Sequence, residues 1–255
     1  MAMALIGSTG FVGRNLARQT VFDDAYHSTN IEEIAGKSYD LVVCAGAPAA
    51  KWIANREPER DWHNLQRLMR CLGQVKTGRL ILISTVDVYP DPVGVDEASP
   101  IDPQKVTAYG RHRYALEDFV RAWFDAVIVR LPGLFGDGLK KNVIYDFLHD
   151  NNVDQVHADA VFQFYGLDRL WRDIQTALAH DLRLVNFATE PTSVAELARH
   201  AFGFDFQNRP VSTPAQYDVR TRHDAVFGGA GGYLYGKAEV LDEMKRFVER
   251  QRAGR

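Results

Sequence analysis

Cysteine is scarce in this 255-residue sequence, with Cys44 and Cys71 as the only two. Cys44 ends an apolar, strand-like run and Cys71 falls in a helical pattern, so both are expected to be small buried side chains. Two isolated thiols without a Cys-x-x-Cys spacing or nearby histidines do not make a zinc site, and we expect no bound metal. A disulfide framework is also excluded, which fits a reducing cytoplasm.

Long apolar runs and an excess of basic charge are lacking as well. No run approaches the roughly 20 residues that a membrane-spanning helix needs, and no basic stretch followed by a long apolar one marks a signal peptide. The formal net charge is -3, which gives no electrostatic case for nucleic-acid binding. Apolar and charged contents of 46% and 25% match an ordinary globular protein. We therefore expect a cytoplasmic protein with neither a nucleic-acid nor a membrane partner.

What is present is an alternation of strand and helix patterns. Residues 40–45, 80–84 and 126–131 are continuous apolar runs, as in strands that are buried on both faces of a parallel sheet. Apolar residues at helical spacing over 62–72 and 115–123 separate these runs. The alternation predicts an α/β fold of the Rossmann type, a doubly wound parallel sheet with helices on both faces.

Two regions depart from this regular alternation. Between residues 19 and 40 the chain is short for a complete strand–helix–strand step, with a weak strand over 25–29 and a brief helix over 31–35. After residue 138 the pattern loosens, with strand candidates at 161–165 and 184–188 and a helix at 194–201. We expect a dinucleotide-binding Rossmann domain over residues 1–137. A smaller α/β substrate-binding region would occupy residues 138–255 and return in part to the Rossmann sheet.

A glycine-rich loop follows the first apolar strand and opens a helix. Gly7 allows the tight turn, Gly10 lets backbone N–H groups approach a pyrophosphate, and Gly13 lets the helix pack on the strand. The helix N-terminus adds unpaired donors and a partial positive charge. The sequence therefore predicts that this loop binds NAD or NADP. The loop residues expected to contact the cofactor are Gly7, Thr9, Gly10, Phe11, Val12 and Gly13.

The residues after the second strand do not decide between NAD and NADP. An acidic residue there would bind the ribose hydroxyls of NAD, and a basic residue would suit the phosphate of NADP. The chain has His27, Ser28, Thr29 and Asn30 at this place. Ser28 and Asn30 are the expected ribose contacts.

Three further motifs follow the loop along the chain. Ala45, Gly46 and Ala47 end a strand, residues 84–89 read Ser-Thr-Val-Asp-Val-Tyr, and residues 109–113 read Tyr-Gly-Arg-His-Arg. Together with the loop and Asn64, these motifs resemble the extended short-chain dehydrogenase/reductase family. That family comprises NAD-dependent epimerases, dehydratases and reductases of nucleotide sugars. Its patterns are GxxGxxG, a small-residue strand end, a helix asparagine, Ser-Ser-x-x-Val-Tyr and Tyr-x-x-x-Lys.

The resemblance makes Thr85, Tyr109 and Arg113 the expected catalytic residues. Tyr109 and Arg113 are four residues apart and share a helix face, so the cation is expected to lower the phenol pKa. Tyr109 would donate a proton to a carbonyl as hydride arrives, and Thr85 would hydrogen-bond the same oxygen. Arg113 departs from the family lysine, being planar, larger and effectively never deprotonated. Cofactor binding is expected to persist, with proton transfer depending on how arginine fits.

Assignments for the substrate and for neighbouring residues are less specific. Residues 130–136 resemble the family's Arg-x-x-Asn-Val-Tyr-Gly with Gly133 in place of asparagine. His112 is expected to be exposed. Asp87 is either a second acid near the substrate or a turn residue that bonds its own backbone. The remaining expected cofactor contacts are Ala45, Gly46, Ala47, Tyr109, Arg113 and Pro132. The substrate candidates are Asp87, Lys140, Asn142 and Arg220, for whose charged members surface solvation is the alternative.

Two functions remain open on these grounds. The leading hypothesis is an NAD(P)-dependent oxidoreductase or epimerase that acts at a hydroxyl or ketone carbon of a nucleotide-linked sugar, with the small second region favouring reduction. The alternative is a non-catalytic NAD(P)-binding sensor, which Arg113 favours and Thr85 with Tyr109 opposes. Relatives often pair through the helices matching residues 61–72 and 109–123, so a homodimer is also expected.

Overall fold

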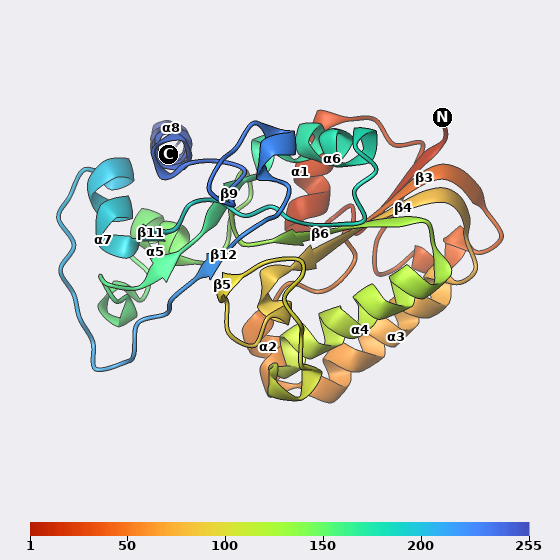
Figure 1. Cartoon of the computed structure of the whole chain (residues 1–255), viewed down its shortest axis with the longest axis horizontal. Helices are drawn as coiled ribbons and strands as arrows, with labels where there is room; N and C mark the ends of the chain where they lie inside the picture. Colours follow the sequence, from red (N-terminus) through yellow and green to blue (C-terminus); the bar gives the residue numbers. More distant parts are fainter. Residues whose placement is uncertain (255) are drawn as a thin grey trace.

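The computed structural model describes residues 1–254 and centres on a six-stranded, wholly parallel sheet (Figure 1). The strand order is β10-β6-β4-β3-β1-β2. The predicted Rossmann-type α/β sheet is confirmed. The strands are β1 (Met3–Ile6), β2 (Asp24–Tyr26), β3 (Ser38–Cys44), β4 (Lys76–Thr85), β6 (Ala126–Leu131) and β10 (Leu184–Asn186).

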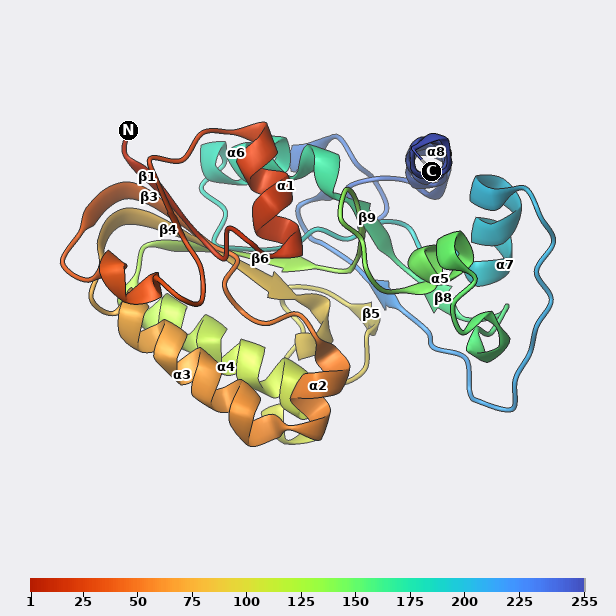
Figure 2. The same ribbon diagram turned by 180° about the vertical axis from the view of Figure 1, so that it is seen from behind.

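Helices cover both faces of the sheet because its strands are apolar on both sides. One face is covered by α1 (Phe11–Gln19) and α6 (Leu170–Ala179) (Figures 1 and 2). The other is covered by α2 (Lys51–Arg56), α3 (Pro58–Leu72) and α4 (Ala108–Trp123). Alternate strand residues divide between two cores, with Val43 and Ile81 in the first and Val42 and Leu82 in the second.

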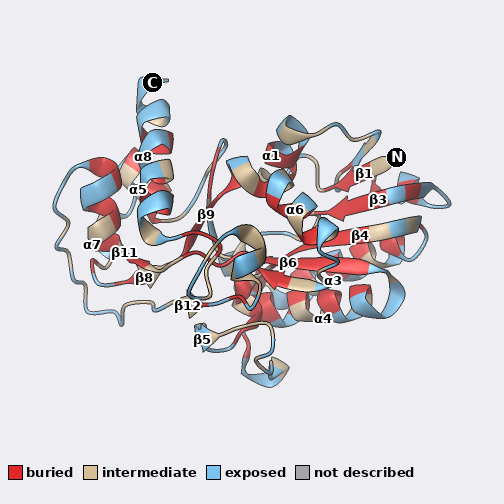
Figure 3. Cartoon of the chain, turned by 45° about the horizontal axis from the view of Figure 1, so that its top comes forward, coloured by how far each residue is buried: buried red, intermediate tan, exposed pale blue. Residues whose placement is uncertain are grey.

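Past β6 the chain builds a smaller lobe beside the sheet, with α5, α7 and α8 (Figure 1). The apolar cluster on the α1 face runs without interruption from Val129 of β6 to Phe247 of α8, and Figure 3 shows buried backbone continuing between the two parts. β10 returns to the sheet and pairs with β6. The division at residue 137 stays a prediction. The elements here are β7 (Gly133–Phe135), α5 (Val143–His149), β8 (Val161–Phe162), β9 (Phe164–Gly166), β11 (Thr192–Ser193), α7 (Val194–Leu197), β12 (Asp218–Val219) and α8 (Lys237–Ala253).

The irregular regions differ from expectation in three places. Strand 25–29 ends at Tyr26, because the side chain of Asn30 accepts a hydrogen bond from the backbone of His27 and closes a turn. Strand 161–165 is split by Gln163, whose side chain donates to the carbonyls of Thr189 and Val219. Helix 194–201 becomes a π-helix over Ala198–Phe202. Short 3-10 turns include η1 (Ile31–Ile34) and η2 (Val86–Val88), and β5 (Val93–Val95) pairs with β12.

The strand order positions the site. The chain runs outward from β1 to β2 and then crosses to β3 on the other side of β1, so the C-terminal ends of β1 and β3 border a crevice. Ligands of open α/β sheets bind at such switch points. Cys44 and Cys71 are buried free thiols, as predicted. Within residues 1–254, no helix is long and apolar enough to cross a membrane and no side-chain group is suited to hold a metal ion.

Candidate functional site

The glycine loop joins β1 to α1 at the crevice. Gly7 has a φ of +86°, and a Cβ on it would lie 2.3 Å from the carbonyl oxygen of Ala45. A Cβ on Gly13 would lie 2.1 Å from the carbonyl oxygen of Gly7. Larger residues at these two positions would therefore push apart the loop, the end of β3 and the start of α1.

The first turn of α1 leaves backbone donors without helical partners. The helix begins at Phe11 after Gly10, and in the described chain no side chain caps it. Arg14 is the first residue whose N–H bonds within the helix, to the carbonyl oxygen of Gly10 at 3.0 Å. A Cβ on Gly10 would meet only the Gly7 oxygen, at 3.2 Å, which leaves the space above the turn open. The loop fits a pyrophosphate, because it offers open space, unpaired N–H groups and the positive end of a helix.

The neighbouring strand ends carry the other expected cofactor contacts. The backbone N–H of Ala45 bonds the Ile6 carbonyl oxygen at 2.9 Å, so the segment 45–47 follows β3 directly beside the loop. Ser28 is exposed after β2. The amide of Asn30 is already used by the His27 N–H at 2.7 Å and the Ala25 carbonyl at 3.3 Å. Ser28 is therefore the freer of the two for a ribose.

Tyr109 lies in the first turn of α4, next to the end of β4 that carries Thr85. The side-chain oxygen of Asn55, in α2, accepts a hydrogen bond from the Tyr109 backbone N–H at 2.9 Å and fixes the start of α4. A Cβ on Gly110 would lie 2.0 Å from the carbonyl oxygen of Asp87, so glycine lets α4 pack directly on the turn after β4. These contacts bring Tyr109 and Thr85 together, as the sequence predicts. Asn55 was not predicted, because no local pattern marks it.

Arg113 lies against Tyr109 but is held from the other side. Its guanidinium carbon is 4.1 Å from the centre of the Tyr109 ring. The two terminal nitrogens donate to Asp61 of α3 at 2.5 and 2.8 Å, and one also reaches the Pro48 carbonyl oxygen. The side chain is 3% exposed. Among residues 1–254 its buried Nε has no hydrogen-bond partner.

The Asp61 carboxylate contacts two residues of α4, Arg113 and His112, and the position of His112 differs from the one expected. His112 is buried, not exposed, and its Nδ1 lies 2.8 Å from the Asp61 carboxylate. Burial alone would raise the pKa of Asp61, but hydrogen bonds from Arg113 and His112 hold that pKa below its ordinary value. Asp61 shares the apolar face of α3 with Leu65, and an acidic residue on such a face is the signal that could have revealed it.

Asp87 is the centre of a second polar cluster. Its carboxylate accepts hydrogen bonds from Lys51 Nζ at 2.8 Å and from the Tyr217 hydroxyl at 3.0 Å. Its backbone N–H donates to Thr85 Oγ1 at 3.1 Å. The interpretation of Asp87 as a turn residue bonding its own backbone is therefore wrong, because its carboxylate accepts hydrogen bonds from two side chains that are distant in sequence. Lys51 and Tyr217 were not predicted, since their sequence neighbourhoods contain no motif.

Opposing influences act on the ionisation of Tyr109. Burial raises the pKa of Tyr109 most, and the Asp87 carboxylate raises it further. The Arg113 and Lys51 cations, and hydrogen bonding with Thr85, lower it. The resulting pKa is above the ordinary value, so Tyr109 is a protonated phenol at neutral pH. The expectation that Arg113 brings this pKa down overall is wrong, because burial outweighs the cation.

Other predicted residues have structural contacts of their own. Asn142 caps α5 by accepting from the Ile144 N–H at 3.0 Å, and its amide donates to the Leu134 carbonyl oxygen at 2.8 Å. Arg220 is exposed and paired with Asp218 at 3.0 Å. Lys140 is exposed. Their roles toward a substrate stay predictions, as does that of Pro132, which lies between β6 and β7.

Two further sequence assignments have a structural outcome. Asn64 is exposed on the outer surface of α3 and lines a groove with Trp123 of α4, away from Tyr109. Gly133 stands where the resemblance expects asparagine. A Cβ there would lie 2.8 Å from the Gln163 carbonyl oxygen, so glycine permits the close pairing of β7 and β9.

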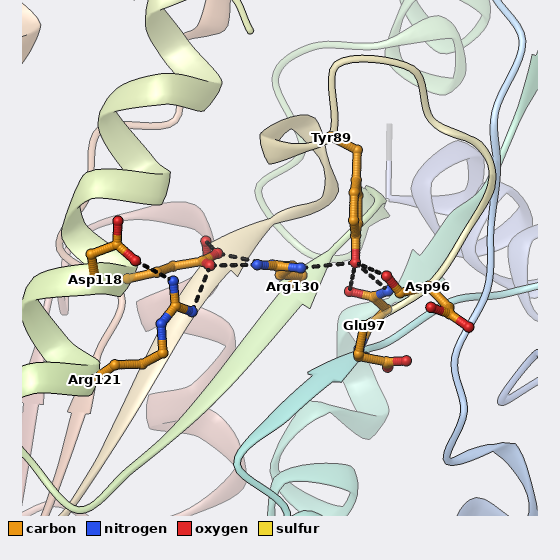
Figure 4. A network of polar contacts seen from close by, with 9 residues as sticks. Tyr89, Asp96, Glu97, Asp118, Arg121 and Arg130 are labelled. Atoms are coloured by element: carbon orange, nitrogen blue, oxygen red, sulfur yellow. Dashed lines mark hydrogen bonds and ion pairs between the residues drawn. The ribbon is translucent and has the colours of Figure 1, made fainter. Parts of the chain in front are cut away.

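A buried polar network fastens β4, α4 and β6 to one another (Figure 4). Arg130 donates to the Glu117 carboxylate at 2.6 and 3.0 Å and to the Tyr89 hydroxyl at 2.8 Å. Ser84, which precedes Thr85, donates to the same carboxylate at 2.5 Å. Asn186 of β10 donates to the Tyr89 hydroxyl at 2.9 Å. The network ties the end of β4 to the helix that carries Tyr109.

Comparisons with known proteins identify the family of the chain. A family model described as the NAD dependent epimerase/dehydratase family matches residues 20–174, more than half of the chain. No curated protein matches. This match begins after the glycine loop, so the loop geometry is an independent observation.

Solved structures align over nearly the whole chain. UDP-glucose 4-epimerase from Thermotoga maritima, solved with UDP-glucose, is 17% identical, with a TM-score of 0.71 and coverage of 100% of this chain and 99% of its own. A dTDP-4-dehydrorhamnose reductase from Clostridium acetobutylicum is 16% identical, with a TM-score of 0.72 and coverages of 99% and 100%. RMD from Pseudomonas aeruginosa, complexed with NADPH, is 15% identical, with a TM-score of 0.75 and coverages of 100% and 100%. These likenesses show a shared fold, and the family match shows that the chain belongs to the NAD dependent epimerase/dehydratase family.

Proposed function

We propose that this protein is an NAD(P)-dependent enzyme that acts at a hydroxyl or carbonyl carbon of a nucleotide-linked sugar, with Tyr109 as the acid/base. The observation that carries the proposal is the hydrogen bonding of Tyr109 with Thr85 at the C-terminal end of β4, the strand next to β3. Structural neighbours solved with NADPH and with UDP-glucose support the cofactor and the substrate class.

Each residue of the site has a separate task in this reaction. The cofactor, when bound at the glycine loop, supplies or accepts the hydride. Tyr109 donates its phenol proton to the carbonyl oxygen, and Thr85 hydrogen-bonds that oxygen so that developing charge is stabilised. Arg113 holds the Tyr109 ring in place by packing its guanidinium on the ring face. A phenol that is protonated at neutral pH is suited to reduction, which we favour over epimerisation.

The reaction type can be tested on the purified protein. An epimerase is expected to retain its cofactor through purification, whereas a reductase exchanges it with solution, so absorbance and mass analysis separate the two. A panel of nucleotide-linked keto sugars with NADH and NADPH then measures hydride transfer at 340 nm. Tight NAD(P) binding with no hydride transfer to any member of the panel would instead favour a non-catalytic sensor.

Replacing Gly10 by alanine is expected to weaken cofactor binding at least about tenfold, equivalent to about 1.4 kcal/mol. The added methyl group would enter the open space above the first turn of α1, where the pyrophosphate approaches the backbone. Isothermal titration calorimetry with NAD and NADP measures the dissociation constants. Gly73→Ala is the matched control, because Gly73 ends α3 with its nearest neighbour at 3.5 Å. Unchanged affinity in Gly10→Ala would place the pyrophosphate elsewhere.

We also propose that the chain forms a homodimer through the outer faces of α3 and α4. A groove of about 900 Å³ lies between these helices, lined by Met69, Phe119 and Trp123 among others. Trp123 is 68% exposed, and a second copy would cover this apolar surface.

Trp123→Glu is therefore expected to give a monomer, because it places a charge on the apolar surface that a second copy would cover. Light scattering coupled to size-exclusion chromatography measures the mass. The control is Trp52→Glu, which changes an equally large exposed side chain on α2, outside the groove. The proposal fails if wild type is monomeric, or if both variants have the same mass as a dimeric wild type.

A further inference from the structure

The family pattern places a lysine four residues after the catalytic tyrosine, and this chain has Arg113 there instead. The Arg113 charge is committed elsewhere, since both terminal nitrogens are bonded to the buried Asp61 carboxylate. The guanidinium is 3% exposed and cannot lose a proton. Arg113 and Asp61 therefore form a fixed ion pair against the face of the Tyr109 ring, and the Arg113 cation lowers the pKa of Tyr109.

A second cation reaches the same turn from a different element. Lys51 is the first residue of α2, and its Nζ donates to Asp87 at 2.8 Å and to the Tyr217 hydroxyl at 3.3 Å. Asp87 is fixed relative to the active pair, because its N–H bonds Thr85 Oγ1 and its carbonyl packs on Gly110, next to Tyr109. The ammonium is therefore held beside Thr85 and Tyr109 by three segments that are distant in sequence.

We propose that Lys51 is a second positioning cation of this site, which offsets the Asp87 carboxylate from α2 and so adds to the effect of Arg113 on Tyr109. This inference rests on the proposed function, in which Tyr109 is the acid/base. The side chain of Lys51 is 43% exposed, so its charge is open to solvent, unlike that of Arg113. In this arrangement Asp87 and Tyr217 hold the ammonium, and the ammonium in turn neutralises the carboxylate nearest to Tyr109.

The charges around Tyr109 determine the direction in which removing Lys51 would shift the pKa of Tyr109. Without Lys51, the Asp87 carboxylate would lose its ion-pair partner, act more strongly on Tyr109 and keep the phenol protonated to higher pH. Burial alone would lower the pKa of Lys51, but Asp87 and Tyr217 outweigh it and raise that pKa, so Lys51 is a cation throughout the neutral range. The charged and titratable groups facing this pair are Arg113 with Asp61 and His112, Asp87, Tyr217, and Lys141 near Asp87.

The test reads the ionisation of Tyr109 directly, without cofactor or substrate. Tyrosine labelled with ¹³C at Cζ is incorporated, and the Tyr109 signal is identified by its loss in Tyr109→Phe. In Lys51→Met the titration midpoint of Tyr109 is expected to move up by about one pH unit. Lys51→Arg keeps the charge and is expected to stay near wild type. The control is Lys105→Met, which removes an exposed lysine paired with Asp102.

Catalysis provides the second readout. In Lys51→Met the limb of the pH–kcat profile that follows Tyr109 is expected to move up in parallel, while KM changes little. An unmoved midpoint in Lys51→Met, or equal shifts in Lys51→Met and Lys51→Arg, would overturn the proposal. Failure of the underlying function is distinguishable, because full turnover in Tyr109→Phe would remove the acid/base itself whatever Lys51 does.

Discussion

Exchanging Tyr109 for phenylalanine is expected to lower kcat by about 10²- to 10⁴-fold, the contribution that a positioned general acid makes. The change removes the hydroxyl and leaves the aromatic ring on which the Arg113 guanidinium lies at 4.1 Å. The cofactor dissociation constant is therefore expected to change by no more than about threefold, less than 0.7 kcal/mol. Stopped-flow absorbance at 340 nm with a responsive keto sugar measures the hydride-transfer rate, and calorimetry measures the affinity.

Tyr114 provides the matched control for this experiment. It lies on α4 five residues after Tyr109, is partly buried, and has the Arg121 guanidinium 5.4 Å from its ring centre. Tyr114→Phe thus removes a phenol hydroxyl from the same helix without touching Thr85. If Tyr109→Phe turns over as fast as Tyr114→Phe, Tyr109 is not the acid/base. Equal losses in both variants would point to damage to α4 rather than to lost proton transfer.

The sheet was predictable because its signals are local. Apolar runs over 40–45, 80–84 and 126–131 became β3, β4 and β6, since a strand buried on both faces must be apolar at consecutive positions. The glycine loop was predictable for a similar reason. Gly13 answers a steric demand within one strand–turn–helix unit, since a Cβ there would lie 2.1 Å from the Gly7 carbonyl oxygen. The 2.3 Å approach at Gly7 is to Ala45 after β3 and follows from the sheet rather than from the loop itself.

The electrostatics of the site could not be predicted in this way. Asp61 and Arg113 are 52 residues apart, and Asp87 and Tyr217 are 130 apart. Each of these pairs depends on tertiary packing and on one particular orientation of a long side chain. His112 illustrates why such side-chain contacts could not be predicted from sequence position. Its position beside Arg113 indicated another helix face, yet both side chains reach the one buried carboxylate of Asp61.

The buried ion pair beneath Thr85 is expected to decide stability. Glu117 is fully buried, and Arg130 is nearly so. Glu117→Ala removes the carboxylate that accepts two bonds from Arg130, one from Ser84 and one from Arg121. The guanidinium would then be a buried charge without its counter-ion, so the free energy of unfolding is expected to fall by about 3–5 kcal/mol. Urea denaturation followed by far-ultraviolet circular dichroism measures this loss.

Two further variants distinguish the stability lost with the ion pair from the stability lost through any change in α4. Asp118→Ala removes an exposed carboxylate from the next position, where it pairs with Arg121, and is expected to cost no more than about 1 kcal/mol. The double variant Glu117→Met with Arg130→Met removes both charges and is expected to recover much of the stability, because a matched apolar pair avoids the desolvation cost. A double variant as unstable as Glu117→Ala would contradict this account. The loss would then arise from the Ser84 hydroxyl left without its partner. Hydrogen bonding rather than charge would then be what holds β4 to α4.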